Sequence, residues 1–373
     1  MKSISTRHLW FYPILFGFLG TLIGLILRYA FANPISGFPL KNVLHSHSHV
    51  MLLGLLFNAL IVLLWINFTK GIDKTSFKYY IGLQVCIAAM MVAFIIQGYA
   101  LFSILFSTLH LWISYILLIR LWKRLEGNTY IISLIKLGII FHFVSSIGPY
   151  CLGPLMALDM QESPWYQQAI FFYLHFQYFG SLFVWLLAVL LQKSTVILKK
   201  NHIILIAISL IFLYAHSLDY NFNHWLINAI GGLGSLLLFM VLLRFWQAFK
   251  FAKKQYTFIY FILLIIAFAN IFGSIPDIAA LVEDNRFMLI AWLHLLFLGL
   301  YIPFIWVELP QKISRSVWIT YGLFVLFSEA VLIFPSYLSN LFATSVMWLL
   351  FIGYFGVFLS ISIVHLKCLF NKK

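Results

Sequence analysis

The chain has 373 residues, of which 63% are hydrophobic, 19% aromatic and only 9% charged. Soluble domains carry about 25% charged residues, so this composition excludes a soluble protein and indicates a polytopic membrane protein. A net charge of +14 would suit nucleic acid, but the basic residues stand in short blocks between apolar runs. Such blocks are topology signals. We therefore expect a lipid bilayer as partner, and no nucleic acid.

No polar stretch is long enough for a separate soluble domain, so we expect one transmembrane domain over residues 1–373. The N-terminal residues lack a small-residue cleavage site, and we interpret them as the start of a first span, not a removed signal. The three cysteines form no C-x-x-C pair. The cysteines therefore indicate neither a disulfide framework nor covalent c-type haem attachment.

The predicted fold is all-α, with about twelve transmembrane helices. Each apolar segment has about the 20 residues that a helix needs to cross a bilayer. The predicted segments lie near residues 9–32, 45–68, 77–97, 102–122, 130–150, 167–192, 200–218, 225–246, 256–276, 287–308, 315–335 and 341–366. The turn between the third and fourth segments has only Gln97, Gly98 and Tyr99 to mark it.

The charges predict the orientation of these helices. If the N-terminus is cytoplasmic, basic residues collect in every inner loop, and only Arg28, Lys41 and Arg286 lie on the outer side. The acidic residues that fall outside are Asp159, Glu162, Asp219, Asp277, Glu283 and Asp284. This positive-inside bias predicts that both termini face the cytoplasm. We expect the protein in the inner (cytoplasmic) membrane of a bacterium.

Nine of the twelve histidines then fall in one outer layer of the membrane, which scattered core or surface histidines would not do. They are His45, His47, His49, His110, His142, His175, His216, His224 and His294. Imidazole binds haem iron, copper and zinc, and it is energetically costly to place in the lipid core of a membrane. The alternative for His110 and His142 is a bundle-facing histidine bonded to a neighbouring helix.

Three histidines share one spacing, a glycine five residues later. The pairs are His49 with Gly54, His175 with Gly180, and His294 with Gly299. Because glycine lets a flat, bulky ring such as a porphyrin approach the backbone, this spacing favours ligation by these three histidines. Helix packing against small residues is the alternative.

The histidines at the start of the second span do not all point one way. His45 and His49 share a helical face, whereas His47 points about 200° away at 100° per residue. One regular helix cannot easily direct all three at one metal. If residues 45–48 are not helical, a compact copper or zinc site becomes an alternative.

Other polar residues lie at a similar depth. Tyr178 follows His175 by three residues, so the two lie on neighbouring faces of one helix. There His175 could serve as a metal ligand and Tyr178 as a proton or electron donor. The alternative for Tyr178 is an interfacial tyrosine in an aromatic belt. Glu329 is the one carboxylate inside a span and is a functional candidate. Arg28, Lys41 and Arg286 are the outer cations available to haem propionates.

The chain resembles subunit I of the haem-copper oxygen and nitric oxide reductases. The resemblance rests on twelve helices with cytoplasmic termini and on short segments around three histidines. His49, in His47-Ser48-His49-Val50-Met51-Leu52-Leu53-Gly54, is similar to the low-spin haem ligand of the family. His294, in Trp292-Leu293-His294-Leu295-Leu296-Phe297-Leu298-Gly299, resembles the opposite axial ligand. His175 matches the position of a copper ligand, with Tyr178 nearby as a catalytic tyrosine.

The chain departs from that family at several positions. The family has an adjacent histidine pair on helix 7, where this chain has only His216. It also has two histidines two residues apart on helix 10, where this chain has Trp292 before His294. The resemblance therefore implies one haem, expected to be b-type, between His49 and His294. A second, non-standard metal or haem site could use His110, His142, His175 and His216, and His47 is a further candidate metal ligand.

The leading functional hypothesis is a haem-binding membrane protein, either an electron-transfer protein or a diverged oxidoreductase of this superfamily. Two axial imidazoles hold iron six-coordinate, which favours electron transfer. The resemblance implies a protein or quinol electron donor and, if a second centre exists, a gaseous substrate. Two alternatives stay open: a transporter or metal-handling protein, since twelve spans are common among transporters, and a cofactor-free assembly subunit.

Overall fold

The computed structural model describes residues 5–218 and 224–370, so the predicted outer residue Asp219 lies outside the described part. Twelve of its helices are long and apolar enough to cross a membrane, and no strand occurs within the described ranges. The predictions of an all-α polytopic membrane protein and of twelve spans are confirmed. The chain divides into two compact units.

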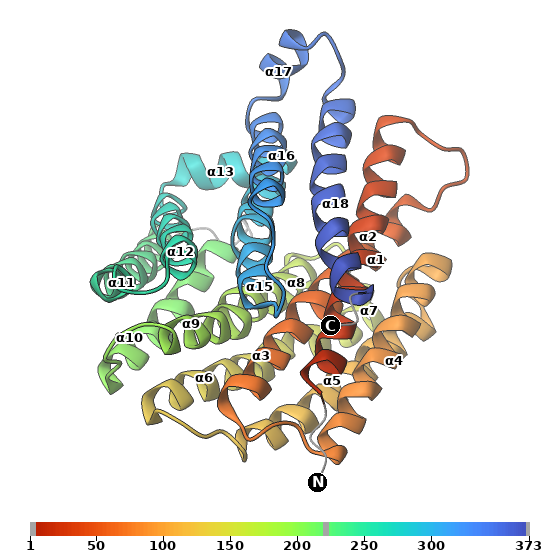
Figure 1. Cartoon of the computed structure of the whole chain (residues 1–373). Helices are drawn as coiled ribbons and strands as arrows, with labels where there is room; N and C mark the ends of the chain where they lie inside the picture. The colour runs from red at the N-terminus through yellow and green to blue at the C-terminus, as the bar shows by residue number, and fades with distance from the viewer. Residues whose placement is uncertain (1–4, 219–223, 371–373) are drawn as a thin grey trace. The chain divides into compact units, whose positions relative to one another are not determined.

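Unit 1 contains the chain up to Leu121 and from Phe287 onward. Its elements are α1 (Thr6–Ala32), α2 (Leu40–His49), η1 (Val50–Phe57), α3 (Asn58–Phe68), α4 (Lys74–Gln97), α5 (Leu101–Trp122), α14 (Arg286–His294), η5 (Leu295–Tyr301), α15 (Ile302–Glu308), α16 (Arg315–Ile333), α17 (Pro335–Leu341) and α18 (Val346–Phe370). Helix α18 packs against both α1 and α16 (Figure 1). The first and last spans are therefore neighbours.

Unit 2 contains residues 122–286. Its elements are α6 (Thr129–Ser145), α7 (Ile147–Ala157), α8 (Pro164–His175), η2 (Phe176–Leu182), α9 (Phe183–Gln192), α10 (Lys200–Leu213), η3 (Tyr214–Ser217), α11 (Trp225–Phe249), α12 (Lys254–Phe272) and α13 (Pro276–Asp284). Helix α11 packs against α10 and α12, and η2 packs against α6 (Figure 1).

A proline inside α1 shows how the helix backbone is satisfied within a span. Pro13 has no N–H, so the carbonyl of Leu9, four residues earlier, loses its helical partner. The hydroxyl of Tyr80 on α4 donates to that carbonyl at 2.8 Å. Since a bare carbonyl is costly in a bilayer, this bond both stabilises α1 and joins it to α4.

The turn between α4 and α5 lies where Gln97, Gly98 and Tyr99 predicted it. Gly98 ends α4 with φ of +64°, a left-handed conformation that favours glycine. Helix α5 then begins at Leu101. The sequence alone did not predict the break at Ser146, where one predicted segment divides into α6 and α7.

Apolar side chains face outward in regular stripes, as a lipid-facing surface requires. On α12 the stripe consists of Phe258, Phe261, Ile265, Phe268 and Phe272, each 42–54% exposed. These positions recur every three or four residues, which places them on one side of the helix.

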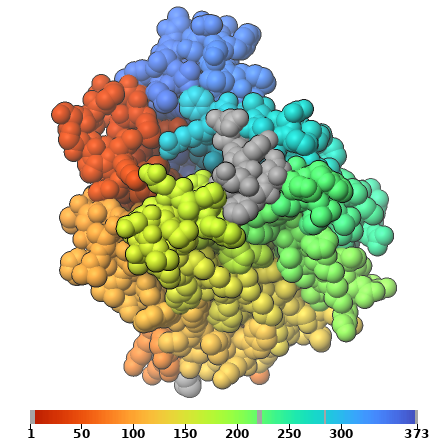
Figure 2. All heavy atoms as spheres, turned by 180° about the vertical axis from the view of Figure 1, so that it is seen from behind, coloured from red at the N-terminus to blue at the C-terminus, as the bar shows by residue number. Residues whose placement is uncertain are grey.

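Similar exposed residues cover α7 and the start of α8, drawn yellow-green in Figure 2: Tyr150, Met156, Leu158 and Trp165. Monomeric soluble proteins rarely expose such extensive apolar surface. These surfaces fit an integral membrane protein surrounded by lipid.

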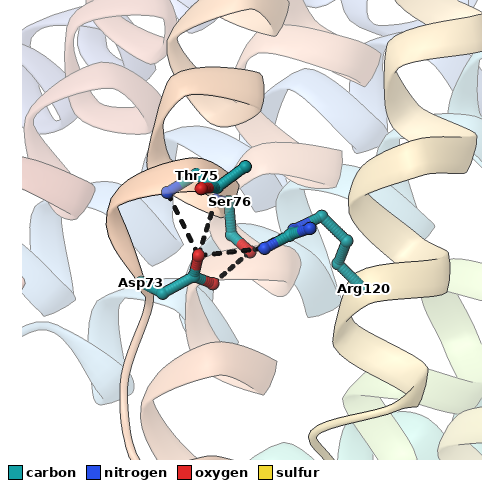
Figure 3. A network of polar contacts seen from close by, with 4 residues as sticks. All are labelled: Asp73, Thr75, Ser76 and Arg120. Carbon is teal, nitrogen blue, oxygen red and sulfur yellow. Dashed lines mark hydrogen bonds and ion pairs between the residues drawn. The ribbon is translucent and has the colours of Figure 1, made fainter.

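A network of charged and polar groups closes the hairpin of α4 and α5 (Figure 3). Asp73 caps the N-terminus of α4 by accepting hydrogen bonds from the backbone N–H groups of Thr75 and Ser76. Arg120, near the end of α5, donates to Asp73 Oδ1 at 3.0 Å and to Ser76 Oγ at 2.8 Å. One carboxylate therefore serves both as helix cap and as ion-pair partner.

We expect Asp73→Ala to lower the free energy of unfolding by about 2 kcal/mol, because it removes the cap and leaves the partly buried Arg120 without this partner. Asp73→Asn keeps a capping oxygen but loses the charge, and should therefore cost less. Thermal unfolding in detergent measures both variants. Equal stability of Asp73→Ala and wild type would contradict this role.

Candidate functional site

Each of the three histidines with the shared glycine spacing stands directly before a π-helix. His49 precedes η1, His175 precedes η2 and His294 precedes η5. π-helical turns are rare and occur frequently at functional sites. The spacing thus marks three places at which the backbone departs from α-helical geometry, one in each of the second, sixth and tenth spans.

The glycines of these motifs are in close contact with the protein's own side chains. A Cβ atom at Gly54 would lie 2.7 Å from Cβ of Phe16, and one at Gly180 would lie 3.0 Å from Cβ of Phe141. The corresponding distance at Gly299 is 3.2 Å, to Leu295 in the same π-helix. The contacts of Gly54 and Gly180 with neighbouring helices are those expected of the packing alternative, whereas that of Gly299 stays within its own helix. They do not test whether a porphyrin binds nearby.

The histidines of α2 occupy two opposite faces, as the helical register predicted. His45 and His49 face the end of α4: the His49 ring lies 4.3 Å from the Phe94 ring, and the His45 ring 4.6 Å from that of Tyr99. His47 instead faces α1, where its Nδ1 donates to the backbone carbonyl of Gly20 at 2.8 Å. Residues 45–48 are helical.

Five residues from different helices form a cluster inside unit 1, which we call the Arg28 cluster. Its members are Arg28 on α1, His47 on α2, His294 on α14, Glu329 on α16 and Tyr354 on α18. Arg28 interacts electrostatically with Glu329 and Tyr354, and His47 with His294. Of the two histidines, His47 is thus the one that interacts with His294, whereas the His49 ring packs against Phe94.

Glycine makes this approach between helices possible. A Cβ atom at Gly24 would lie 2.3 Å from the hydroxyl of Tyr354 and 2.7 Å from Cε1 of His47. The Tyr354 hydroxyl also donates to the carbonyl of Thr21 at 3.3 Å. Only a residue without a side chain at position 24 leaves room for both rings.

Within the cluster, His294 lies beside Glu329, a carboxylate inside the span formed by α16. Its Nδ1 is 3.3 Å from Oε1 of Glu329, and the two side chains are 20% and 13% exposed. Neither atom has a hydrogen-bond partner in the described ranges, so the contact is one of charge and distance. A carboxylate beside Nδ1 favours a proton on that nitrogen, which leaves Nε2 as the electron-pair donor.

The same tautomer follows for the two other histidines. Nδ1 of His47 donates to Gly20, and Nδ1 of His49 donates to the carbonyl of His45 at 2.9 Å. A carbonyl can only accept, so each Nδ1 carries the proton. His47 and His49 therefore present Nε2 as an electron-pair donor, the arrangement of metal-binding histidines, and the carboxylate beside Nδ1 favours the same tautomer for His294.

The predicted propionate partners differ in their surroundings. Arg28 lies in the Arg28 cluster, whereas Arg286 begins α14 with an exposed side chain, and Lys41 on α2 is exposed as well. His110, on α5, is only 2% exposed, and its ring lies 5.7 Å from that of Phe57. Of the predicted outer cations, Arg28 is the one inside a cluster of histidines.

In unit 2, both nitrogens of His175 already have partners. Nε2 donates to the backbone carbonyl of Leu210 at 2.8 Å, and Nδ1 lies 3.4 Å from the hydroxyl of Ser217. To bind a metal, His175 would have to give up one of these contacts. His216 similarly contacts the Ser235 hydroxyl through Nε2 at 2.8 Å.

Tyr178, the predicted catalytic tyrosine, lies in η2 and is partly exposed. The tyrosine whose ring the structure places beside His175 is Tyr214, at 5.4 Å between ring centres. Gln168 donates to the Tyr214 hydroxyl and to the carbonyl of Ser217. The predicted spacing of three residues did not identify Tyr214, because the contact joins two spans that are separate in sequence.

His142 belongs to a fully buried polar group around Gln177. The side-chain oxygen of Gln177 accepts from Nδ1 of His142 at 3.2 Å, from Ser145 at 3.2 Å and from Ser181 at 3.3 Å. All four residues are at most 2% exposed. This agrees with a bundle-facing histidine bonded to a neighbouring helix. An intramembrane glutamine in a π-helix was the signal that sequence reasoning overlooked.

Across residues 5–218 and 224–370, no group of three or more His, Cys, Asp or Glu side chains is arranged to hold a metal ion. The Arg28 cluster offers two imidazoles at most. The chain matches no model of a known protein family, and no curated protein is significantly similar to it in sequence.

Proposed function

We propose that this protein is an integral membrane haem protein whose haem would be held in unit 1 by the imidazoles of His294 and His47. The observation that carries the proposal is the surroundings of the two Nδ1 atoms: that of His47 donates to the carbonyl of Gly20, and that of His294 lies 3.3 Å from the carboxylate of Glu329, so Nε2 of each ring is left to bind a metal. A haem held by two histidines needs two protein ligands only, so a larger ligand group is not required.

The surrounding residues suit this role. Glu329 orients His294, and the carbonyl of Gly20 orients His47. Arg28 supplies a cation for an anionic propionate. Buried cations and carboxylates are costly in a membrane and usually serve a function. The pairing of His49 with His294 that the sequence suggests stays a prediction. We prefer His47 because the His49 ring packs against Phe94 of α4.

Such a haem would carry single electrons, and two imidazole ligands would close both axial positions to external ligands. The chain's residues fix the tautomer of His47, place a carboxylate beside His294 and keep the guanidinium of Arg28 in the same cluster. The proposal is therefore an electron-transfer protein. A reductase would need a second centre, and the three candidate histidines of unit 2, His142, His175 and His216, each already have a ring nitrogen in a hydrogen bond.

The first test is the visible spectrum of the purified protein, with haem and copper analysis of the same sample. We expect a sharp α-band on reduction, about one haem per chain, and no shift under carbon monoxide. A colourless protein, after expression with added haem, would contradict the proposal and favour the transporter or assembly alternatives. A carbon monoxide shift would contradict the six-coordinate arrangement.

A further inference from the structure

A shallow groove lies at the end of unit 2 where α11 and α12 meet. It is lined by Trp246, Lys250, Ala252, Lys254, Thr257, Phe258 and Phe261. Positive charge and aromatic surface therefore occur together, at an end of the hairpin that the charge distribution assigns to the cytoplasm.

The positive charge of the groove is not neutralised by the protein. Lys250 and Lys254 are exposed, and no ion pair in the described ranges includes either of them. The sequence from Asn221 to Pro276 contains no aspartate or glutamate, but it contains Arg244, Lys250, Lys253 and Lys254. An anionic ligand would balance the positive charge of these lysines.

The groove has a rigid base. The rings of Phe249 and Tyr260 stack at 3.8 Å between their centres, and the Tyr260 hydroxyl donates to the carbonyl of Leu242 at 2.6 Å. Thr257 donates to the carbonyl of Phe249 at 2.7 Å. These contacts fix the turn between the helices, so both lysines are presented from an ordered frame.

The groove continues directly into the lipid-facing surface. Phe258 and Phe261 line it and are also the first two members of the outward stripe on α12, which goes on through Ile265 and Phe268. A ligand that fits both parts has an anionic head and a long apolar tail. A free anion would use the lysines only.

We propose that this groove binds an anionic phospholipid, with its phosphate between Lys250 and Lys254 and an acyl chain along Phe261 and Ile265. Basic pockets at cytoplasmic helix ends suit such headgroups. A groove of the same chemistry occurs in unit 1, where Lys312 and Lys367 lie among Ile313, Val317 and Ile363. The inference does not depend on the haem proposal.

The test is lipid retention, counted by native mass spectrometry after release from nanodiscs of phosphatidylcholine mixed with phosphatidylglycerol. We expect wild type to retain phosphatidylglycerol in preference to phosphatidylcholine. In the Lys250→Gln/Lys254→Gln variant, the amount of retained phosphatidylglycerol should fall by roughly tenfold or more, since each lysine near the surface contributes substantially to binding anionic lipid. Thermal unfolding in detergent checks that the variant is folded.

Lys253→Gln is the matched control, because Lys253 is exposed in the same turn but does not line the groove. It should retain phosphatidylglycerol like wild type. An equal loss in this control would show a diffuse charge effect and would overturn the proposal, as would equal retention of both lipids by wild type. Displacement of the lipid by inorganic phosphate would identify a free-anion site instead, and would also overturn it.

Discussion

Replacing His294 by alanine should remove the haem, from about one per chain to almost none, without unfolding the protein. The reason is that His294 alone in the Arg28 cluster has both a carboxylate beside Nδ1 and a free Nε2. Iron left with one axial imidazole binds more weakly and becomes open to external ligands. The haem-to-protein ratio of the purified variant measures the effect.

The two histidines on opposite faces of α2 provide the matched comparison. His47→Ala should lose haem as His294→Ala does, because its ring faces α1 and the Arg28 cluster. His49→Ala should keep it, since the His49 ring packs on Phe94. The opposite result, loss in His49→Ala and retention in His47→Ala, would restore the pairing predicted from sequence. Retention in all three variants would rule out a bis-histidine haem at this place.

The second large effect concerns the contact between α10 and α11. A Cβ atom at Gly234 would lie 2.7 Å from the backbone nitrogen of Leu213 and 2.9 Å from the carbonyl oxygen of Ser209. Backbone atoms of a neighbouring helix cannot rotate away as the end of a side chain can. We expect Gly234→Ala to lower the free energy of unfolding by about 1–3 kcal/mol, and Gly234→Val to lower it further.

Thermal unfolding in detergent measures this effect, with Gly322→Ala as the control. Gly322 lies inside α16, where a Cβ atom would meet nothing within 4 Å. Alanine there should be neutral or stabilising, by up to about 1 kcal/mol, because glycine is a poor helix former. If both variants unfold at the same temperature, close backbone packing at Gly234 does not limit the stability of unit 2.

The sequence predicted the spans well because each needs one local property, about 20 apolar residues, that no distant contact can change. The turn at Gly98 was predicted for the same reason. Which side chains contact one another was harder to predict. Helical register correctly placed His47 opposite His45 and His49, and the rarity of an intramembrane carboxylate pointed to Glu329.

No local pattern could show that Glu329 lies beside His294, or that Tyr214 lies beside His175. Both contacts join helices that are far apart in sequence, and they depend on how the spans pack. The predicted pairing of His49 with His294 relied on their depth in the membrane, on the shared spacing to glycine and on the family resemblance, none of which reports which helix faces meet. Depth fixes the height of a residue in a bundle but leaves open which neighbour its helix face meets.

The three π-helices give the histidine-to-glycine spacing a geometric meaning. In an α-helix two residues five apart differ by about 140° around the axis, so they point to different sides. A π-helix closes its turns from residue i to residue i+5. The first such turn of η1 spans His49 and Gly54, and those of η2 and η5 span His175 and Gly180, and His294 and Gly299. In each case the histidine and the glycine are therefore the first and last residues of one i to i+5 turn. The five-residue spacing matches the length of that turn, and the residue one turn after the histidine has no side chain.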